Sequence, residues 1–224
     1  MDIVLTSVEA RVLGALIEKE MSTPEYYPLT LNALISACNQ KSNREPVMNL
    51  EEKSVVRAIE GLQQKHLVWQ RNTAEGRVPK YAHGIGSRFE FSPPQVAVLC
   101  VLLLRGPQTP GEIRGRTARL HEFGDLSEVE ETLQQLAEHE GGPFVVKLPR
   151  QAGCRESRYA HLLCGEVKGE QGECGQGLPP PQRATLEVRA ENERIAELEQ
   201  QVADLRAEVD ELRRLFSEFT RQFE

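Results

Sequence analysis

The stretch Lys80-Tyr81-Ala82-His83 recurs 78 residues later as Arg158-Tyr159-Ala160-His161. Each copy follows the same order of patterns: three helical segments, a short apolar stretch and a turn that contains glycine. A repeated order of elements at a fixed spacing indicates a repeated structural unit. Three helices followed by a hairpin are typical of a winged helix. We therefore predict a mainly α-helical protein with small β-hairpins (an α+β fold), in which two winged-helix domains, residues 1–91 and 92–164, stand in tandem.

Capping patterns predict where the helices begin. A Ser or Thr side chain can accept a hydrogen bond from the third residue of a helix, and a Glu or Gln at that position can bond back to the cap. This pattern marks helix starts at Thr6, Ser92 and Thr109. A further helix is expected from Thr30. The third helix of each domain is expected to be capped by Asn49 and by Ser127, respectively.

Short apolar stretches on either side of the two turns predict the hairpin strands, at residues 67–71, 78–82, 144–148 and 158–163. The repeated Tyr81 and Tyr159 are expected to pack on the core with a bonded hydroxyl, because repeated core positions are typical of repeated units. Trp69 is expected in the core as well. The run Val96–Leu104 is apolar on all sides, which predicts a deeply buried helix.

The C-terminal part has a different pattern. Residues 165–185 are rich in glycine and proline and are expected to form a linker. In residues 186–224, apolar side chains recur with the heptad spacing of a coiled coil, which predicts a C-terminal coiled-coil helix that forms a homodimer. The predicted seam consists of Ile195, Leu198, Val202, Leu205, Val209, Leu212, Phe216 and Phe219. The alternative is a helix that packs back on the domains of its own chain.

Composition excludes several classes of protein. The longest apolar run is about half of what a membrane span needs, and five cysteines without close pairs fit neither a disulfide framework nor a zinc site. We therefore expect a cytoplasmic protein with no membrane contact, metal or cofactor. The net charge is −7, of which residues 165–224 contribute −6 from 8 basic and 14 acidic side chains. The two predicted domains are nearly neutral, without the basic excess of a constitutive DNA-binding protein.

Basic side chains of the first domain are candidates for DNA contact, since a winged helix places its third helix in the major groove and its hairpin on the phosphate backbone. The candidates are Lys41, Asn43, Arg44, Lys53, Arg57, Arg77 and Lys80. Glu51 and Glu52, at the start of the third helix, oppose this interpretation. The alternative is a solvated surface with a capping pair.

The second domain is a poorer candidate for DNA contact. Its expected third helix, residues 127–140, contains five glutamates and no Lys or Arg, so a phosphate backbone would repel it. Arg116 and Arg119 on the preceding helix could grip phosphates, but pairing with the acidic helix beside them is the preferred interpretation. The acidic second domain and the acidic tail both suit a protein partner.

Two longer stretches, Cys38–Met48 and Leu104–Glu112, resemble the YceH-like family of bacterial proteins of unknown function, as do His121–Phe123 and Arg155–Tyr159. The resemblance covers roughly residues 3–164. It implies tandem winged helices in a bacterial cytosolic protein, and it implies no activity, cofactor or substrate.

The residues contain no motif for nucleotide binding, zinc-dependent hydrolysis or dinucleotide binding, so no catalytic residue is predicted and an enzyme is not expected. The preferred hypothesis is a DNA-associated protein, similar to a transcription regulator, that self-associates through its C-terminal coiled coil. The alternative is a protein–protein interaction adaptor with no nucleic-acid role.

Overall fold

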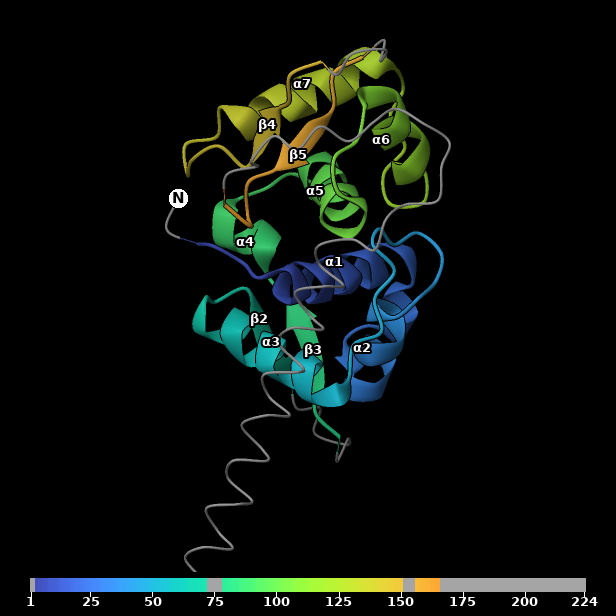
Figure 1. The fold of residues 1–224 in the computed structure, drawn as a ribbon, viewed down its shortest axis with the longest axis vertical. Helices are drawn as coiled ribbons and strands as arrows, with labels where there is room; N and C mark the ends of the chain where they lie inside the picture. The colour runs from blue at the N-terminus through green and yellow to red at the C-terminus, as the bar shows by residue number, and fades with distance from the viewer. Residues whose placement is uncertain (1–2, 72–77, 151–155, 166–224) are drawn as a thin grey trace, which may run out of the picture. The chain divides into compact units, whose positions relative to one another are not determined.

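Helix α1 (Ser7–Ser22) opens the first lobe, by which we mean the described residues 3–71 and 78–91 (Figure 1). The computed structural model describes residues 3–71, 78–150 and 156–165, all of which belong to one compact unit. After α1 come the 3-10 turn η1 (Pro24–Tyr26), strand β1 (Leu29–Thr30), α2 (Leu31–Cys38), α3 (Glu52–Gln64), β2 (Val68–Arg71), β3 (Lys80–His83) and α4 (Ile85–Phe89). The three strands form an antiparallel sheet in the order β1-β3-β2.

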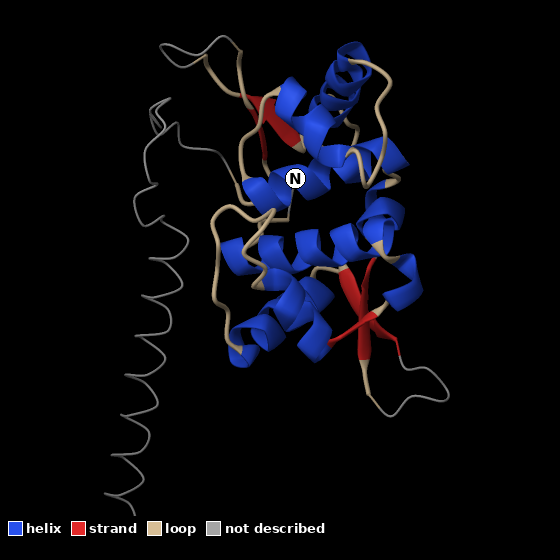
Figure 2. Cartoon of the chain, turned by 90° about the vertical axis from the view of Figure 1, so that its right-hand side faces the viewer, coloured by secondary structure: helices blue, strands red, loops and turns tan. Residues whose placement is uncertain are grey.

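The second lobe consists of the described residues 92–150 and 156–165. It contains α5 (Pro93–Arg105), α6 (Pro110–Thr117), α7 (Leu126–Ala137), β4 (Val145–Lys147) and β5 (Tyr159–His161). Figure 2 shows the strands as two small separate sheets, one in each lobe, with helices making up most of the rest. The expectation of a mainly helical protein with small antiparallel hairpins is confirmed at this level.

The repeated phrase has a structural cause in the pairing of each hairpin with a third segment. In the first lobe Tyr81 lies opposite Leu29 of β1, a strand too short to be predicted from the sequence. In the second lobe Tyr159 forms an isolated bridge with Gln108, and each of these two residues donates a backbone hydrogen bond to the other. In each lobe, the repeated tyrosine is therefore the residue through which the hairpin pairs with the segment that precedes the second helix.

The burial of the repeated phrase differs from the prediction. Ala82 and Ala160 are buried in both copies, each 3% exposed, and His83 is buried at 8%, whereas Tyr81 and Tyr159 are half-buried. The prediction for Trp69 is wrong, because this side chain is 37% exposed. Its ring covers Gly84, where an added Cβ would lie 1.6 Å from the ring. The side chain thus shields the backbone at the end of the hairpin instead of filling the core.

The predicted capping boxes at Thr6, Ser92 and Thr109 are confirmed, and Thr30 caps α2 by accepting a hydrogen bond from the Ala33 N–H. The two predicted caps of the third helices are wrong. The cap of α3 is Glu51 rather than Asn49, and the cap of α7 is Asp125 rather than Ser127. Leu50 stays outside α3 because its N–H donates to the Asn39 side chain and its carbonyl accepts from it.

Helix α5 is buried on all sides because it serves both lobes. Residues Gln95–Leu104 are all buried, which confirms the prediction from the apolar run. On one side the helix packs against α6 and α7 of its own lobe, and on the other against α1. The contact with α1 includes Gly14, where an added Cβ would lie 2.9 Å from the Leu104 side chain. A residue without a side chain lets the two helices approach this closely.

Two further contacts join the lobes. The Leu5 N–H donates to the Leu163 carbonyl at 2.7 Å, and the Glu45 N–H donates to the Leu104 carbonyl at 2.8 Å. The two lobes therefore share one apolar interface and these two backbone hydrogen bonds.

The predicted linker, apart from Gly165, and the predicted coiled coil at residues 186–224 with its seam lie outside the described residues. Among the residues that the structure describes, none of the helices has the length and apolar character that a membrane crossing requires.

Candidate functional site

A buried arginine anchors the connector between α2 and α3, residues 39–50, to the helices beneath it. The Arg44 side chain is fully buried and forms a two-pronged ion pair with Glu18 of α1, with nitrogen–oxygen distances of 2.5 and 3.0 Å. The same guanidinium donates to the Ala37 carbonyl and to the Gln40 side chain. Arg44 therefore fixes the connector on α1 by a paired fork of charge-assisted hydrogen bonds.

A second buried arginine holds both ends of the connector. Arg11 of α1 is 1% exposed and donates to the carbonyls of Cys38 (3.2 Å) and Pro46 (2.6 Å). Burial, and then the nearby charge of Arg44, lower the pKa of Arg11 to about 10. Burial also raises the pKa of the Cys38 thiol to about 12, so this cysteine is an inert core residue. The connector is thus a loop on a rigid support, as binding loops commonly are.

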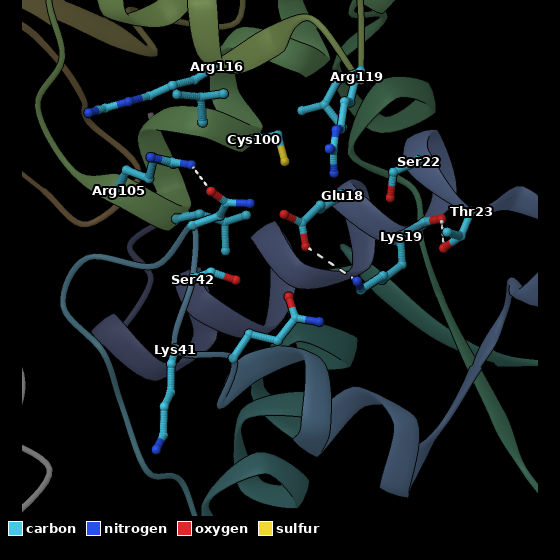
Figure 3. Close-up of a pocket in the computed structure, with 15 residues that line it drawn as sticks. Glu18, Lys19, Ser22, Thr23, Lys41, Ser42, Cys100, Arg105, Arg116 and Arg119 are labelled. Carbon is cyan, nitrogen blue, oxygen red and sulfur yellow. Dashed lines mark hydrogen bonds and ion pairs between the residues drawn. The ribbon is translucent and has the colours of Figure 1, made fainter.

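The outer side of this connector forms one wall of a cavity of about 720 Å³ (Figure 3). The other walls come from the C-terminal half of α1, the C-terminal half of α5 and the end of α6 with the turn that follows it. The lining residues are Glu18, Lys19, Ser22, Thr23, Gln40, Lys41, Ser42, Asn43, Cys100, Val101, Leu104, Arg105, Arg116, Arg119 and Leu120. A cavity of this volume lies in the range of small-molecule binding sites.

The lining of the cavity is strongly basic. Five of its side chains are cationic, namely Lys19, Lys41, Arg105, Arg116 and Arg119, and Glu18 is the one acidic side chain among the lining residues. The Glu18 carboxylate already pairs with the buried Arg44. The cavity therefore has an excess of positive charge in a chain whose net charge is −7.

Figure 3 shows how the cationic groups are arranged. The Arg119 guanidinium points towards the space over Glu18 and Lys19, whereas Lys41 points away from the centre. Arg105 lies on the opposite side of the cavity from Arg119 and donates to the side chain of Asn43. Burial, and then the charges of Arg116 and Arg44, lower the pKa of the Arg105 guanidinium. Arg105 thus lies within electrostatic reach of two further cations, Arg116 and Arg44.

The structure separates the residues predicted to contact DNA into two groups. Lys41 and Asn43 line the cavity, and Arg44 lies beneath it, 5% exposed. The guanidinium of Arg44 is engaged with protein groups, so we leave this residue out of any nucleic-acid surface. Asn43 adopts a positive φ of 60°, which turns its side chain towards Arg105 of the other lobe.

The second group lies on α3 and the hairpin of the first lobe. Lys53 and Arg57 are exposed on α3, four residues apart on one face. Lys80 of β3 is the register partner of exposed Arg71 on β2, so two cationic residues are paired at the end of the hairpin that adjoins its turn. Arg77 lies outside the described residues.

The basic residues of α6 do not pair as predicted. Arg116 forms an ion pair with Glu112 one turn earlier on its own helix, at 3.5 Å, and Arg114 donates to the Gly124 carbonyl. Among the described residues, no hydrogen bond or ion pair joins Arg119 to the acidic helix α7. The glutamates Glu128, Glu130 and Glu131 of α7 are exposed, so this helix presents a negatively charged surface.

Several residues of the cavity escaped sequence reasoning. Glu18 and Lys19 end an amphipathic helix and Arg105 ends an apolar one, positions at which charged residues are ordinary. One signal was present: the two long stretches that carry the family resemblance, Cys38–Met48 and Leu104–Glu112, meet at this cavity. If these two stretches are taken as parts of one site, their contact is expected.

Comparison with known proteins gives a consistent result. The family described as "Protein of unknown function, DUF480" matches residues 5–154. A UPF0502 protein of Geobacter sulfurreducens is 58% identical over 224 residues, covering 100% of both chains. The UPF0502 protein of Geobacter metallireducens is 57% identical over 227 residues, also with 100% of both chains covered. The UPF0502 protein YceH of Escherichia fergusonii is 48% identical over 202 residues, which cover 88% of this chain and 94% of that protein.

Proposed function

Because the chain belongs to the UPF0502 (DUF480) family of bacterial proteins, whose description states no function, we propose a function from its own residues. We propose that it is a DNA-associated regulator whose two lobes are tandem winged helices and whose first lobe contacts DNA. The order helix, strand, two helices and hairpin in the first lobe supports the winged-helix assignment. The bridge between Gln108 and Tyr159 supports the same assignment for the second lobe.

The observation that carries the DNA proposal is the cationic pair on the hairpin of the first lobe. Arg71 and Lys80 are register partners, and like charges directly opposite each other destabilise a hairpin. A phosphate backbone would offset this repulsion. Lys53 and Arg57 add a second like-charged pair on α3, but the exposed Glu52 and Glu60 lie on the same helix. We therefore assign the main phosphate contact to the hairpin and a minor one to α3.

Reversing the charges of the hairpin tests this proposal. The double variant Arg71→Glu/Lys80→Glu is expected to bind mixed DNA fragments more weakly than the parent. The negative slope of log affinity against log salt concentration is also expected to become shallower by about 2, since each of the two cations would no longer neutralise a phosphate. Fluorescence anisotropy of the full chain at several salt concentrations measures both quantities.

The control for this variant is the hairpin of the second lobe. Lys147 and Arg150 are exposed, and Lys147→Glu/Arg150→Glu makes the same change in net charge. Equal losses of affinity in both double variants would show that only the net charge of the protein matters, and a parent protein that does not bind DNA at low salt would contradict the DNA proposal as a whole.

The alternative function, an adaptor for another protein, is supported by α7. This helix exposes Glu128, Glu130 and Glu131, its C-cap Glu138 is exposed as well, and it contains no Lys or Arg. A partner with a basic surface would complement it. Absence of DNA binding, together with stoichiometric binding of a protein that the substitution Glu130→Lys/Glu131→Lys abolishes, would favour this function.

We also propose that the chain forms a homodimer through the heptad seam in residues 186–224. A charge at a central d position is expected to break such a seam, because it would be buried against the partner helix. The variant Leu205→Lys is therefore expected to elute as a species of half the mass of the parent in size-exclusion chromatography with light scattering. Ala207→Lys, an equal change two residues away and off the seam, serves as control. A parent that elutes as a monomer would contradict the proposal.

A further inference from the structure

The cavity between the connector, α1, α5 and α6 has the composition of a site for a small anion. Its five cationic side chains come from four segments that are far apart in the sequence, and the one lining carboxylate, that of Glu18, is neutralised by Arg44. Within the protein, Lys19 also pairs with Glu18 and Arg116 pairs with Glu112, but the lining keeps an excess of positive charges. An anion in the cavity would interact favourably with several of them at once.

The kind of cationic group narrows the ligand to an oxyanion. Three of the five are arginines, whose planar guanidinium donates two parallel hydrogen bonds to a phosphate or a carboxylate. Arg105 is held in place by its hydrogen bond to Asn43, whereas Arg116 pairs with Glu112 of its own helix and points away from the centre of the cavity in Figure 3. Arg119 has no hydrogen bond or ion pair with another described residue, so its donors are available to a ligand.

The remaining lining narrows the ligand further. Ser22, Thr23 and Ser42 offer hydroxyl groups, and Gln40 offers an amide, whereas apolar lining is confined to Cys100, Val101, Leu104 and Leu120. Burial raises the pKa of the Cys100 thiol, so it is not a reactive group here. The site thus suits a polar molecule with hydroxyl groups rather than an apolar one.

The rim of the cavity is held in place before any ligand arrives. Arg11 and Arg44 fix the connector from below, and the hydrogen bond from the Glu45 N–H to the Leu104 carbonyl fixes it against α5. A pre-formed site loses little conformational freedom on binding, which favours affinity for a small ligand.

We propose that this cavity binds a small organic phosphate, with Arg105 and Arg119 holding the phosphate oxygens from opposite sides and Lys19 adding a third charge. This site lies apart from the hairpin of the first lobe, and the proposal does not depend on DNA binding. It places the ligand at the junction of the two stretches that carry the family resemblance.

Calorimetric titration of the full chain with inorganic pyrophosphate tests the proposal, in a chloride buffer of constant ionic strength. We expect saturable binding with one site per chain. Arg119→Ala is expected to weaken this binding about tenfold or more, through the loss of charge-assisted hydrogen bonds. Lys19→Ala is a second variant, in the wall formed by α1, with an expected loss in the same direction. Both side chains are partly or fully exposed at the surface, so the fold is expected to persist, which thermal unfolding checks.

The matched control is Arg114→Ala, which removes an exposed arginine from α6 outside the cavity. It is expected to leave pyrophosphate binding unchanged. The proposal is overturned if pyrophosphate does not bind, or if Arg114→Ala weakens binding as much as Arg119→Ala. Preference for citrate over pyrophosphate would overturn the assignment to a phosphate. Displacement of pyrophosphate by duplex DNA would overturn the assignment to a small molecule and make the cavity a part of the DNA contact.

Discussion

The variant Arg44→Ala is expected to lose about 3–5 kcal/mol of unfolding free energy, because it removes the fully buried partner of an ion pair and leaves Glu18 with only the longer pairing to Lys19 at 3.8 Å. The Glu18 carboxylate, 16% exposed, would then remain in the wall of the cavity without its two-pronged partner. The Ala37 carbonyl would lose its donor as well. Urea denaturation of the parent and the variant measures the difference.

The control for Arg44→Ala is Lys41→Ala, three residues earlier on the same connector. Lys41 is exposed, so its removal is expected to change the unfolding free energy by less than about 0.5 kcal/mol. A loss of less than about 1 kcal/mol for Arg44→Ala would be the size of a surface ion pair and would contradict the structural role given to it here. The two variants also distinguish Lys41 from Arg44, to which the sequence analysis assigned the same role, contact with DNA.

The second large effect is expected at the contact between α1 and α5. Gly14→Val would place side-chain atoms where a Cβ alone already lies 2.9 Å from Leu104 and 3.2 Å from Leu103. Helix α5 is packed on all sides and cannot move away, so we expect a loss of about 1–3 kcal/mol from overpacking. A fall in the urea midpoint, with a second transition if the lobes separate, would report it.

Glycine substitutions on α6 provide the comparison for Gly14→Val. An added Cβ at Gly115 meets no atom within 4 Å. Gly115→Ala is therefore expected to stabilise the protein by about 0.5–1 kcal/mol, since alanine restricts the unfolded chain more than glycine does. If Gly14→Val were tolerated as well as Gly115→Ala, the close approach of α1 and α5 would not be a feature of the protein in solution.

Features of the fold that depend on neighbouring residues could be predicted from the sequence. The capping boxes at Thr6, Ser92 and Thr109 each join residues three apart. The two residues that form the contact are therefore the same two that form the sequence pattern. The cap at Asn49 failed because the competing contact, between Asn39 and Leu50, spans 11 residues and leaves no periodic trace. Strand β1 has two residues, too few for an alternating pattern.

The candidate site was less accessible to sequence reasoning, for the same reason. Arg44 and Glu18 are 26 residues apart, and Arg105 and Asn43 are 62 apart. An exposed arginine and a buried one look alike in a polar loop, so Arg44 was assigned to DNA contact together with Lys41. Only the folded structure distinguishes a buried cation that holds a loop in place, such as Arg44, from an exposed cation on the surface of the loop, such as Lys41.

The contact between α1 and α5 also sets the order in which the chain can fold during synthesis. Helix α1 ends at Ser22, and its partner α5 is complete only at Arg105. At a rate of about 5–20 residues per second, the roughly 80 residues between them take about 4–16 s to be added. Throughout this interval the nascent first lobe exposes the apolar face of α1 around Gly14. The apolar face of α1 is thus covered by its own chain only when α5 has emerged.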